Sequence, residues 1–141
     1  MEHYQAIIVD DDYENRYSFD LAFQKTNWSD EVKIIDSVDR LLNYLQSLPN
    51  SCHYPLLIVL SYDVQKKNGG HVLASLRQHP LFKVIPVIVY ASHMPPLLSD
   101  KLLSLGAMEC FQKEAGLEQT LHLVKKLKSL AATLAEMPRR Y

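Results

Sequence analysis

The feature that most constrains the fold is a run of five apolar residues, Leu56–Leu60, near the middle of the chain. A strand that is apolar at every position is typical of a parallel sheet, because helices cover both of its faces. Further strand patterns occur at 6–9, 32–36, 85–90 and 108–111, and each is followed by apolar residues at helical spacing. Five strand and helix pairs in strict alternation predict an α/β fold, with a doubly wound, five-stranded parallel sheet between two layers of helices.

Length and composition limit the chain to one small globular unit. Its 141 residues, 48% of them hydrophobic and 22% charged, predict a single domain over residues 1–141. A formal net charge of −1 argues against nucleic acid and anionic membrane surfaces as partners, since no overall positive field attracts them. The apolar runs are far shorter than the roughly 20 residues of a membrane helix, and two cysteines are too few for a disulfide framework. We therefore expect a cytoplasmic protein that binds neither nucleic acid nor membranes.

Polar residues follow the predicted strands at one edge of the sheet. In such sheets ligands bind outside the carboxyl ends of the strands, close to the point where the strand order reverses. The residues expected around one crevice are therefore Asp10, Asp11, Ser61, Ala91 and Lys113. Two adjacent carboxylates suit a divalent cation bound through oxygen, and a lysine at the rim suits an oxyanion such as phosphate. A simpler interpretation is that the acidic residues only cap the following helix, because aspartate favours helix starts.

The order and spacing of six short motifs resemble a response-regulator receiver domain of the CheY-like type. Within residues 4–130 these motifs are Ile7–Asp12, the strand that ends at Ser61, Asn68–Gly69, Pro86–Tyr90, Gly106–Ala107 and Phe111–Lys113. The resemblance implies a flavodoxin-like fold. It also implies two-component (phosphorelay) signalling, in which a histidine kinase transfers a phosphoryl group, assisted by Mg²⁺, to an aspartate at the end of the third strand.

The resemblance assigns roles to four residues of the crevice. Asp10 and Asp11 match the family's metal-binding acidic pair, and Lys113 matches its phosphoryl-pairing lysine. The phosphoacceptor position falls on Ser61, so the chain departs from the family by lacking the acceptor aspartate. With this serine the charged residues of the crevice leave a net charge of −1, whereas an acceptor carboxylate would make it −2. We therefore expect Mg²⁺, if it binds here, to bind more weakly than in the family.

The family's two switch positions also carry unusual residues. The hydroxyl residue expected after the fourth strand is Ala91, and the aromatic residue expected in the fifth strand is Cys110. Ala91 has no hydroxyl to contact a phosphoryl oxygen, and a thiol cannot fill or leave a pocket as an aromatic ring can. The resemblance therefore implies that the usual conformational switch is absent.

The leading interpretation is a stand-alone receiver protein, without enzymatic activity, that acts by docking to another protein and without phosphorylation of the usual residue. Its partner would be a histidine kinase, a downstream effector or a second copy of the chain. A second interpretation keeps Mg²⁺-dependent phosphotransfer at Ser61 or Asp63. A third treats Asp10 and Asp12 as the nucleophile and acid of a haloacid-dehalogenase-like phosphatase, although Glu14 stands where that family has a small residue.

The last predicted helix, over about residues 117–137, carries apolar residues on two seams. The first seam is suited to packing on the sheet and consists of Leu117, Leu121, Val124 and Ala131. The second steps by four and three residues, as in associating helices, and consists of Leu123, Leu127, Leu130, Leu134 and Met137. Together they are wider than the roughly 100° stripe of a one-sided surface helix. The second seam is therefore a candidate interface for a partner or a homodimer, unless a neighbouring helix of the same chain covers it.

Overall fold

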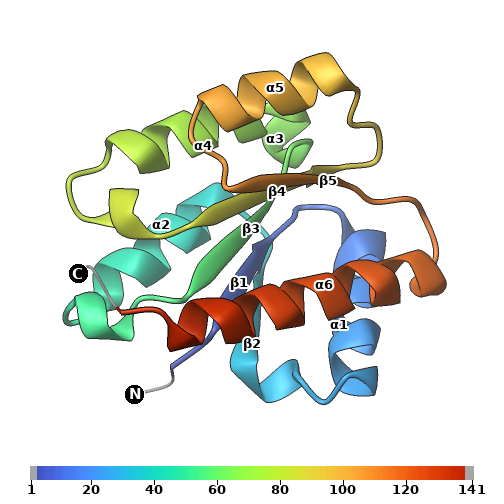
Figure 1. Ribbon diagram of the computed structural model, residues 1–141, viewed down its shortest axis with the longest axis horizontal. Helices are drawn as coiled ribbons and strands as arrows, with labels where there is room; N and C mark the ends of the chain where they lie inside the picture. The colour runs from blue at the N-terminus through green and yellow to red at the C-terminus, as the bar shows by residue number, and fades with distance from the viewer. Residues whose placement is uncertain (1–2, 139–141) are drawn as a thin grey trace.

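The centre of the molecule is a five-stranded parallel sheet with the strand order β2-β1-β3-β4-β5 (Figure 1). The computed structural model describes residues 3–138. Its strands are β1 (Ala6–Val9), β2 (Val32–Ile35), β3 (Leu57–Ser61), β4 (Val87–Ala91) and β5 (Glu109–Gln112). The predicted strands agree with these to within two residues at either end. The doubly wound, flavodoxin-like fold expected from the strand and helix alternation is confirmed.

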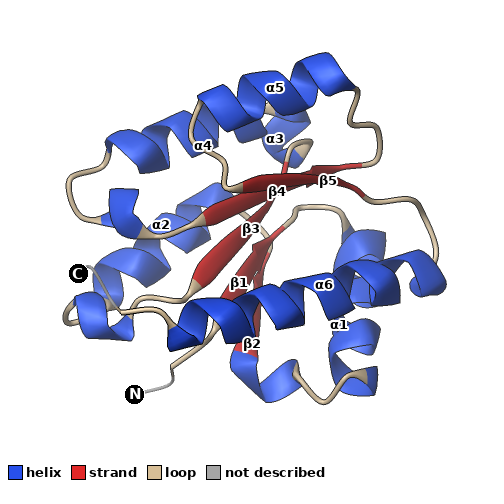
Figure 2. Cartoon of the chain, in the orientation of Figure 1, coloured by secondary structure: helices blue, strands red, loops and turns tan. Residues whose placement is uncertain are grey.

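Helices cover both faces of this sheet (Figure 2). One face carries α1 (Tyr13–Lys25) and α6 (Leu117–Glu136). The other carries α2 (Val38–Ser47), the short α3 (Val64–Lys67), α4 (Gly69–Gln78) and α5 (Pro96–Ser104). Single turns of 3-10 helix occur at Ser29–Glu31, Ser51–His53 and Phe82–Val84. None of the helices within residues 3–138 combines the length and the apolar character needed to cross a bilayer.

The core consists of two apolar clusters, one on each face of the sheet. Strand β1 shows the division most simply, because its side chains alternate between the two faces. Ile7 and Val9 pack in the cluster beneath α2, α4 and α5, whereas Ala6 and Ile8 pack in the cluster beneath α1 and α6. All four residues are fully buried. Two covered faces explain why the sequence of this strand is apolar at every position.

The position of α6 corrects the expectation of an exposed second seam. Leu123 and Leu127, which were expected at an interface, are 5% and 0% exposed and lie in the cluster beneath α1 and α6. Leu130 and Leu134 are half-buried and pack against the same cluster. The physical reason is that α1 runs beside α6, so that α6 is covered by the sheet on one side and by its neighbour on the other. The first two residues of the seam are therefore covered within the chain, whereas Met137 at its end is 49% exposed.

Candidate functional site

The carboxyl ends of β3 and β4 and the segment after β5 surround a small cavity of about 120 Å³. Its lining includes three residues expected in the crevice, Ser61, Ala91 and Lys113. The remaining lining residues are Asn15, Asp63, Tyr90, Ser92 and Ala115. Two hydrogen bonds connect this cavity to Asp10, which directly follows β1, because Tyr90 and Asn15 both donate to its carboxylate. The structure therefore brings the ends of separate strands together, as the position of the strand-order reversal predicts.

Asp10 is a buried carboxylate, 1% exposed, that accepts hydrogen bonds from three directions. The backbone N–H of Asp12 donates to Oδ1 at 2.9 Å, and the side-chain amide of Asn15 donates to Oδ2 at 3.0 Å. The hydroxyl of Tyr90 also donates to Oδ2. Burial raises the pKa of Asp10 above its ordinary value, while these three hydrogen bonds act in the opposite direction. The carboxylate is thus removed from water, but hydrogen bonds from the protein occupy most of its acceptor positions.

Tyr90 is the largest polar side chain at the site, and it is 2% exposed. Its ring packs edge-on against Phe19 of α1, with the ring centroids 5.5 Å apart. Burial, followed by the charge of Asp10, raises the pKa of Tyr90 well above its ordinary value, and a hydrogen bond with the Ser61 hydroxyl acts in the opposite direction. The phenol therefore remains protonated at neutral pH and serves as a hydrogen-bond donor.

Lys113 reaches the same network indirectly. It is 6% exposed, its ammonium donates to Oδ1 of Asn15 at 3.3 Å, and its Nζ lies 5.7 Å from the centre of the Phe19 ring. Burial lowers the pKa of Lys113, and the nearby charges of Asp10 and Asp12 partly restore it. Asn15 therefore stands between the lysine and the carboxylate of Asp10 and contacts both.

Ser61 ends β3 and is almost completely buried, at 3% exposure. Its hydroxyl oxygen accepts a hydrogen bond from the backbone N–H of Asp63 at 3.2 Å. Within residues 3–138, no hydrogen bond joins Ser61 to the carboxylate of Asp10 or Asp11. A serine hydroxyl needs an adjacent base to become a good nucleophile, and these two carboxylates accept their hydrogen bonds from other residues.

Asp11 and Asp12 have separate roles. Asp12 is exposed and caps α1, because its Oδ2 accepts the backbone N–H of Asn15 at 2.9 Å. The carboxylate of Asp11 accepts the backbone N–H of Gln65 at 2.9 Å, 54 positions along the chain. The helix-capping interpretation of the acidic run is therefore correct for Asp12, whereas Asp10 is buried and Asp11 contacts the loop after β3.

That loop contains an element that the sequence pattern did not predict. Gln65, Lys66 and Lys67 have φ angles of 51°, 60° and 66°, so the segment labelled α3 includes a short left-handed turn. Residues other than glycine adopt this region at a cost of about 1–3 kcal/mol each. The hydrogen bond from the first of these residues to Asp11 is one contact that holds the turn in place.

The residues expected to bind Mg²⁺ fit a cation poorly in this arrangement. A carboxylate has about four acceptor positions, and three donors already contact Asp10. The carboxylate of Asp11 contacts Gln65, so the two acidic side chains serve different partners. In the part of the chain that the structure describes, no three His, Cys, Asp or Glu side chains are grouped to hold a metal ion.

Of the two expected switch positions, one lies at the cavity and the other lies outside its lining. Ala91 is buried in the lining and presents a methyl group. Cys110 is half-buried in β5 and packs against the cluster beneath α2, α4 and α5. Its thiol donates a weak hydrogen bond to the backbone oxygen of Ser99 at 3.9 Å, and burial raises its pKa. The thiol is therefore directed to α5.

Two important residues, Tyr90 and Asn15, were not identified from the sequence. A signal for Tyr90 exists, since a buried tyrosine needs a partner for its hydroxyl and the other residues of its strand are aliphatic. The pairing of Tyr90 with Ser61 in the register of β3 and β4 completes that argument only once the register is known. Asn15 lies in the first turn of α1, where the sequence offers nothing that distinguishes a surface amide from one directed to Asp10.

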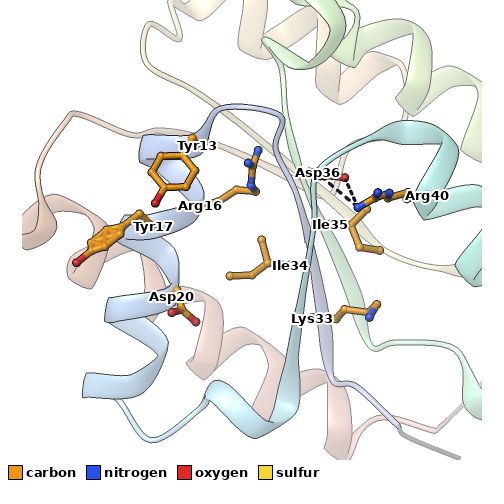
Figure 3. A pocket seen from close by; sticks show the side chains of 9 residues that line it. All are labelled: Tyr13, Arg16, Tyr17, Asp20, Lys33, Ile34, Ile35, Asp36 and Arg40. Atoms are coloured by element: carbon orange, nitrogen blue, oxygen red, sulfur yellow. Dashed lines mark hydrogen bonds and ion pairs between the residues drawn. The ribbon is translucent and has the colours of Figure 1, made fainter.

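A larger cavity of about 450 Å³ lies at the edge of the sheet, between α1, β2 and the start of α2 (Figure 3). Its basic residues already have partners. Arg40 pairs with Asp36 at 3.2 Å, and Arg16 donates to the backbone oxygen of Asp10 at 3.2 Å and lies over the ring of Tyr13. Lys33 is the third basic residue of this lining, and its ammonium lies over the rings of Tyr4 and Tyr44. We assign this cavity no function.

Comparison with known proteins agrees with this geometry. The family model described as "Response regulator receiver domain" matches residues 6–125. The solved structures that resemble the chain include the phosphorylated cyanobacterial phytochrome response regulator RcpA, with 24% identity, 96% of this chain and 99% of that chain covered, and a TM-score of 0.77. The Mn²⁺-bound response regulator Rcp1 has 21% identity, 97% and 99% coverage, and a TM-score of 0.73. The response regulator RPA3017 of R. palustris, from red light signalling, has 16% identity, 94% and 97% coverage, and a TM-score of 0.76.

No curated protein matches the chain. The structural neighbours share less than a quarter of their residues with the chain, so they establish its fold. The match to the family model establishes more, because it covers most of the chain and includes the strand ends that form the cavity. The chain belongs to the response regulator receiver domain family.

Proposed function

We propose that this receiver-domain response regulator of two-component signalling acts by docking to a partner protein and does so without phosphorylation of the residue that ends β3. The observation that carries the proposal is the state of Ser61, which lines the cavity as an alcohol and whose hydroxyl oxygen accepts a hydrogen bond from the backbone N–H of Asp63. By resemblance, this is the position of the family's phosphoacceptor aspartate. An alcohol there lacks the negative charge that makes a carboxylate an effective acceptor.

The neighbouring residues support the same conclusion. Ala91 offers no hydroxyl to a phosphoryl group at the cavity, and Cys110 is directed to Ser99. Neither residue can perform the coupled movement that the resemblance implies for the family. A partner would therefore recognise one constant surface of the protein.

Weaker Mg²⁺ binding than in the family is part of this proposal. A serine in place of a carboxylate removes one negative ligand for the cation, and the hydrogen bonds to Asp10 compete for another. The expected partner is a histidine kinase, a downstream effector or a second copy of the chain. Burial of Leu123 and Leu127 removes those two residues of α6 from the candidate contact surface. Leu130 and Leu134 are half-buried and remain candidates for homodimer contact.

Incubation with acetyl phosphate and Mg²⁺, followed by intact-mass measurement, tests the proposal. We expect no phosphoryl adduct on the wild-type protein under conditions that label a receiver domain with an acceptor aspartate. The matched variant is Ser61→Asp, which restores a carboxylate at the end of β3. A rapid Mg²⁺-dependent adduct on the wild-type protein would contradict the proposal. Cleavage of that adduct by hydroxylamine would identify an acyl phosphate on a carboxylate such as Asp63, and resistance to hydroxylamine would identify an ester of the Ser61 hydroxyl.

A second candidate function rests on Asp63, which lines the same cavity as Lys113. In this alternative, Mg²⁺-dependent phosphotransfer takes place at Asp63 or at the Ser61 hydroxyl. Its test is labelling that Asp63→Asn or Ser61→Ala abolishes, with the other variant as the control. The phosphatase interpretation has weaker support, because Asp12, its expected acid, caps α1. The phosphatase interpretation predicts that the protein hydrolyses a generic phosphate ester, and an assay for that turnover tests it.

A further inference from the structure

The carboxylate of Asp10 is bound by donors from three separate parts of the chain. One is the backbone of the turn that follows β1, one is the Asn15 amide on α1, and one is the Tyr90 hydroxyl on β4. A divalent cation at this carboxylate would have to use the same oxygen lone pairs. Three hydrogen-bond donors of the protein therefore contact Asp10 at the place where the family resemblance implies a metal ion.

The Tyr90 hydroxyl is held in this position by the surrounding packing. Its ring contacts Phe19, which in turn stacks on Phe23 with the ring centroids 5.7 Å apart. Both phenylalanines are buried in the cluster beneath α1 and α6. Rotation of Tyr90 away from Asp10 would require these rings to move, and a close-packed interior opposes that movement. A cation therefore competes with a donor whose ring is packed against Phe19 and which borders only the small cavity at the strand ends.

Asn15 provides a second link, which brings positive charge to the same group. Its amide nitrogen donates to Asp10, while its amide oxygen accepts from the ammonium of Lys113. In this way one side chain connects Lys113 with the Asp10 carboxylate, whose charge partly offsets the lowering of the lysine pKa by burial. An added divalent cation would be repelled by Lys113 and would have to displace Asn15.

We propose that Tyr90 and Asn15 take the place of a divalent cation at Asp10 and hold the crevice in a single metal-independent arrangement. This inference concerns the same site as the proposed function, but it rests on the hydrogen bonds of Asp10 rather than on phosphorylation. It identifies Tyr90 as the residue that blocks metal binding and Asn15 as its support. Removal of these two donors should convert Asp10 into a metal ligand.

Titration with Mn²⁺, followed through the electron paramagnetic resonance signal of the free ion, tests this inference. We expect the wild-type protein to bind little Mn²⁺ at millimolar concentration. In Tyr90→Phe combined with Asn15→Ala, we expect the affinity for Mn²⁺ to rise at least about tenfold, which is the effect of freeing a carboxylate from one strong hydrogen bond. Adding Asp10→Asn to this double variant should remove the gain.

Tyr54→Phe is the matched control, because Tyr54 is also a buried tyrosine but precedes β3, at the opposite end of that strand. It should leave Mn²⁺ binding unchanged. Fluorescence of Trp28 checks that each variant is folded, and if the double variant unfolds, Asn15→Ala alone should still gain affinity. Tight Mn²⁺ binding by the wild-type protein, or no gain in any folded variant, would overturn the inference. Neither result depends on whether the protein is phosphorylated, so this test and the acetyl phosphate test can fail separately.

Discussion

The hydroxyl of Tyr90 donates a hydrogen bond to the carboxylate of Asp10, although the two residues are 80 positions apart in the sequence. Strand β3 lies between their strands in the sheet, so this contact passes over the end of β3 and over Ser61. The two side chains therefore meet beside Ser61, the position that the resemblance gives to the family's acceptor. This contact should stabilise the fold, and it also sets the environment of the Asp10 carboxylate in the site.

Tyr90→Phe should lower the free energy of unfolding by about 1–3 kcal/mol, because the buried Asp10 carboxylate loses a donor. Chemical denaturation followed by the fluorescence of Trp28 measures this loss. A double-mutant cycle with Asp10→Asn isolates the contact, since the effect of Tyr90→Phe should shrink when the carboxylate is absent. Strict additivity of the two substitutions would show that the contact contributes nothing.

Gly106→Ala should destabilise the protein more than Gly116→Ala does. Both glycines have positive φ angles, 109° and 111°, so both substitutions introduce backbone strain. An added Cβ at Gly106 would lie 2.6 Å from Cγ of Arg77, whereas at Gly116 it would meet nothing within 4 Å. The difference between their unfolding free energies, about 1–3 kcal/mol, reports the clash with Arg77. Equal losses would mean that Arg77 moves aside freely.

Leu127→Ala and Leu97→Ala should differ strongly in their effect on stability. Leu127 is fully buried in the cluster beneath α1 and α6, and its truncation should cost about 2–5 kcal/mol because it leaves a cavity. Leu97 is 84% exposed at the start of α5, and its truncation should change stability by less than about 0.5 kcal/mol. Thermal unfolding of both variants measures the difference. A small effect of Leu127→Ala on stability would indicate that Leu127 is accessible and could contact a partner.

Cys110 should react more slowly with a thiol reagent than Cys52. Burial raises the pKa of Cys110, so less of it is thiolate near neutral pH, whereas Cys52 is exposed. The folded state keeps the proton more tightly than the unfolded state. The resulting contribution to stability is present at neutral pH and is lost as the pH rises through the raised pKa.

Labelling of Cys52→Ser and Cys110→Ser separates the two thiols. The rate at Cys110 should increase with pH up to a value above the ordinary range of a free thiol. Equal rates for both residues at neutral pH would show that Cys110 is accessible and unperturbed.

Some parts of the site could be predicted from the sequence, and others depended on information that a sequence pattern does not contain. The alternation of strands and helices places Asp10, Ser61 and Lys113 at one edge of the sheet, because the carboxyl ends of parallel strands meet there. The direction of Tyr90 depends on the register of β4 against β3. The periodicity of α6 shows which residues are apolar but not which neighbour covers them, so the sequence left open whether a partner or a helix of the same chain buries Leu123.

The left-handed turn at Gln65–Lys67 affects how readily a protease cleaves the chain there. Lys66 and Lys67 are exposed, but trypsin requires an extended substrate, and the turn holds both lysines in a different backbone conformation. The carboxylate of Asp11 restrains the start of this segment. A molecule that withdrew that carboxylate would let the segment straighten, so cutting after these lysines reports whether the Asp11 contact is intact.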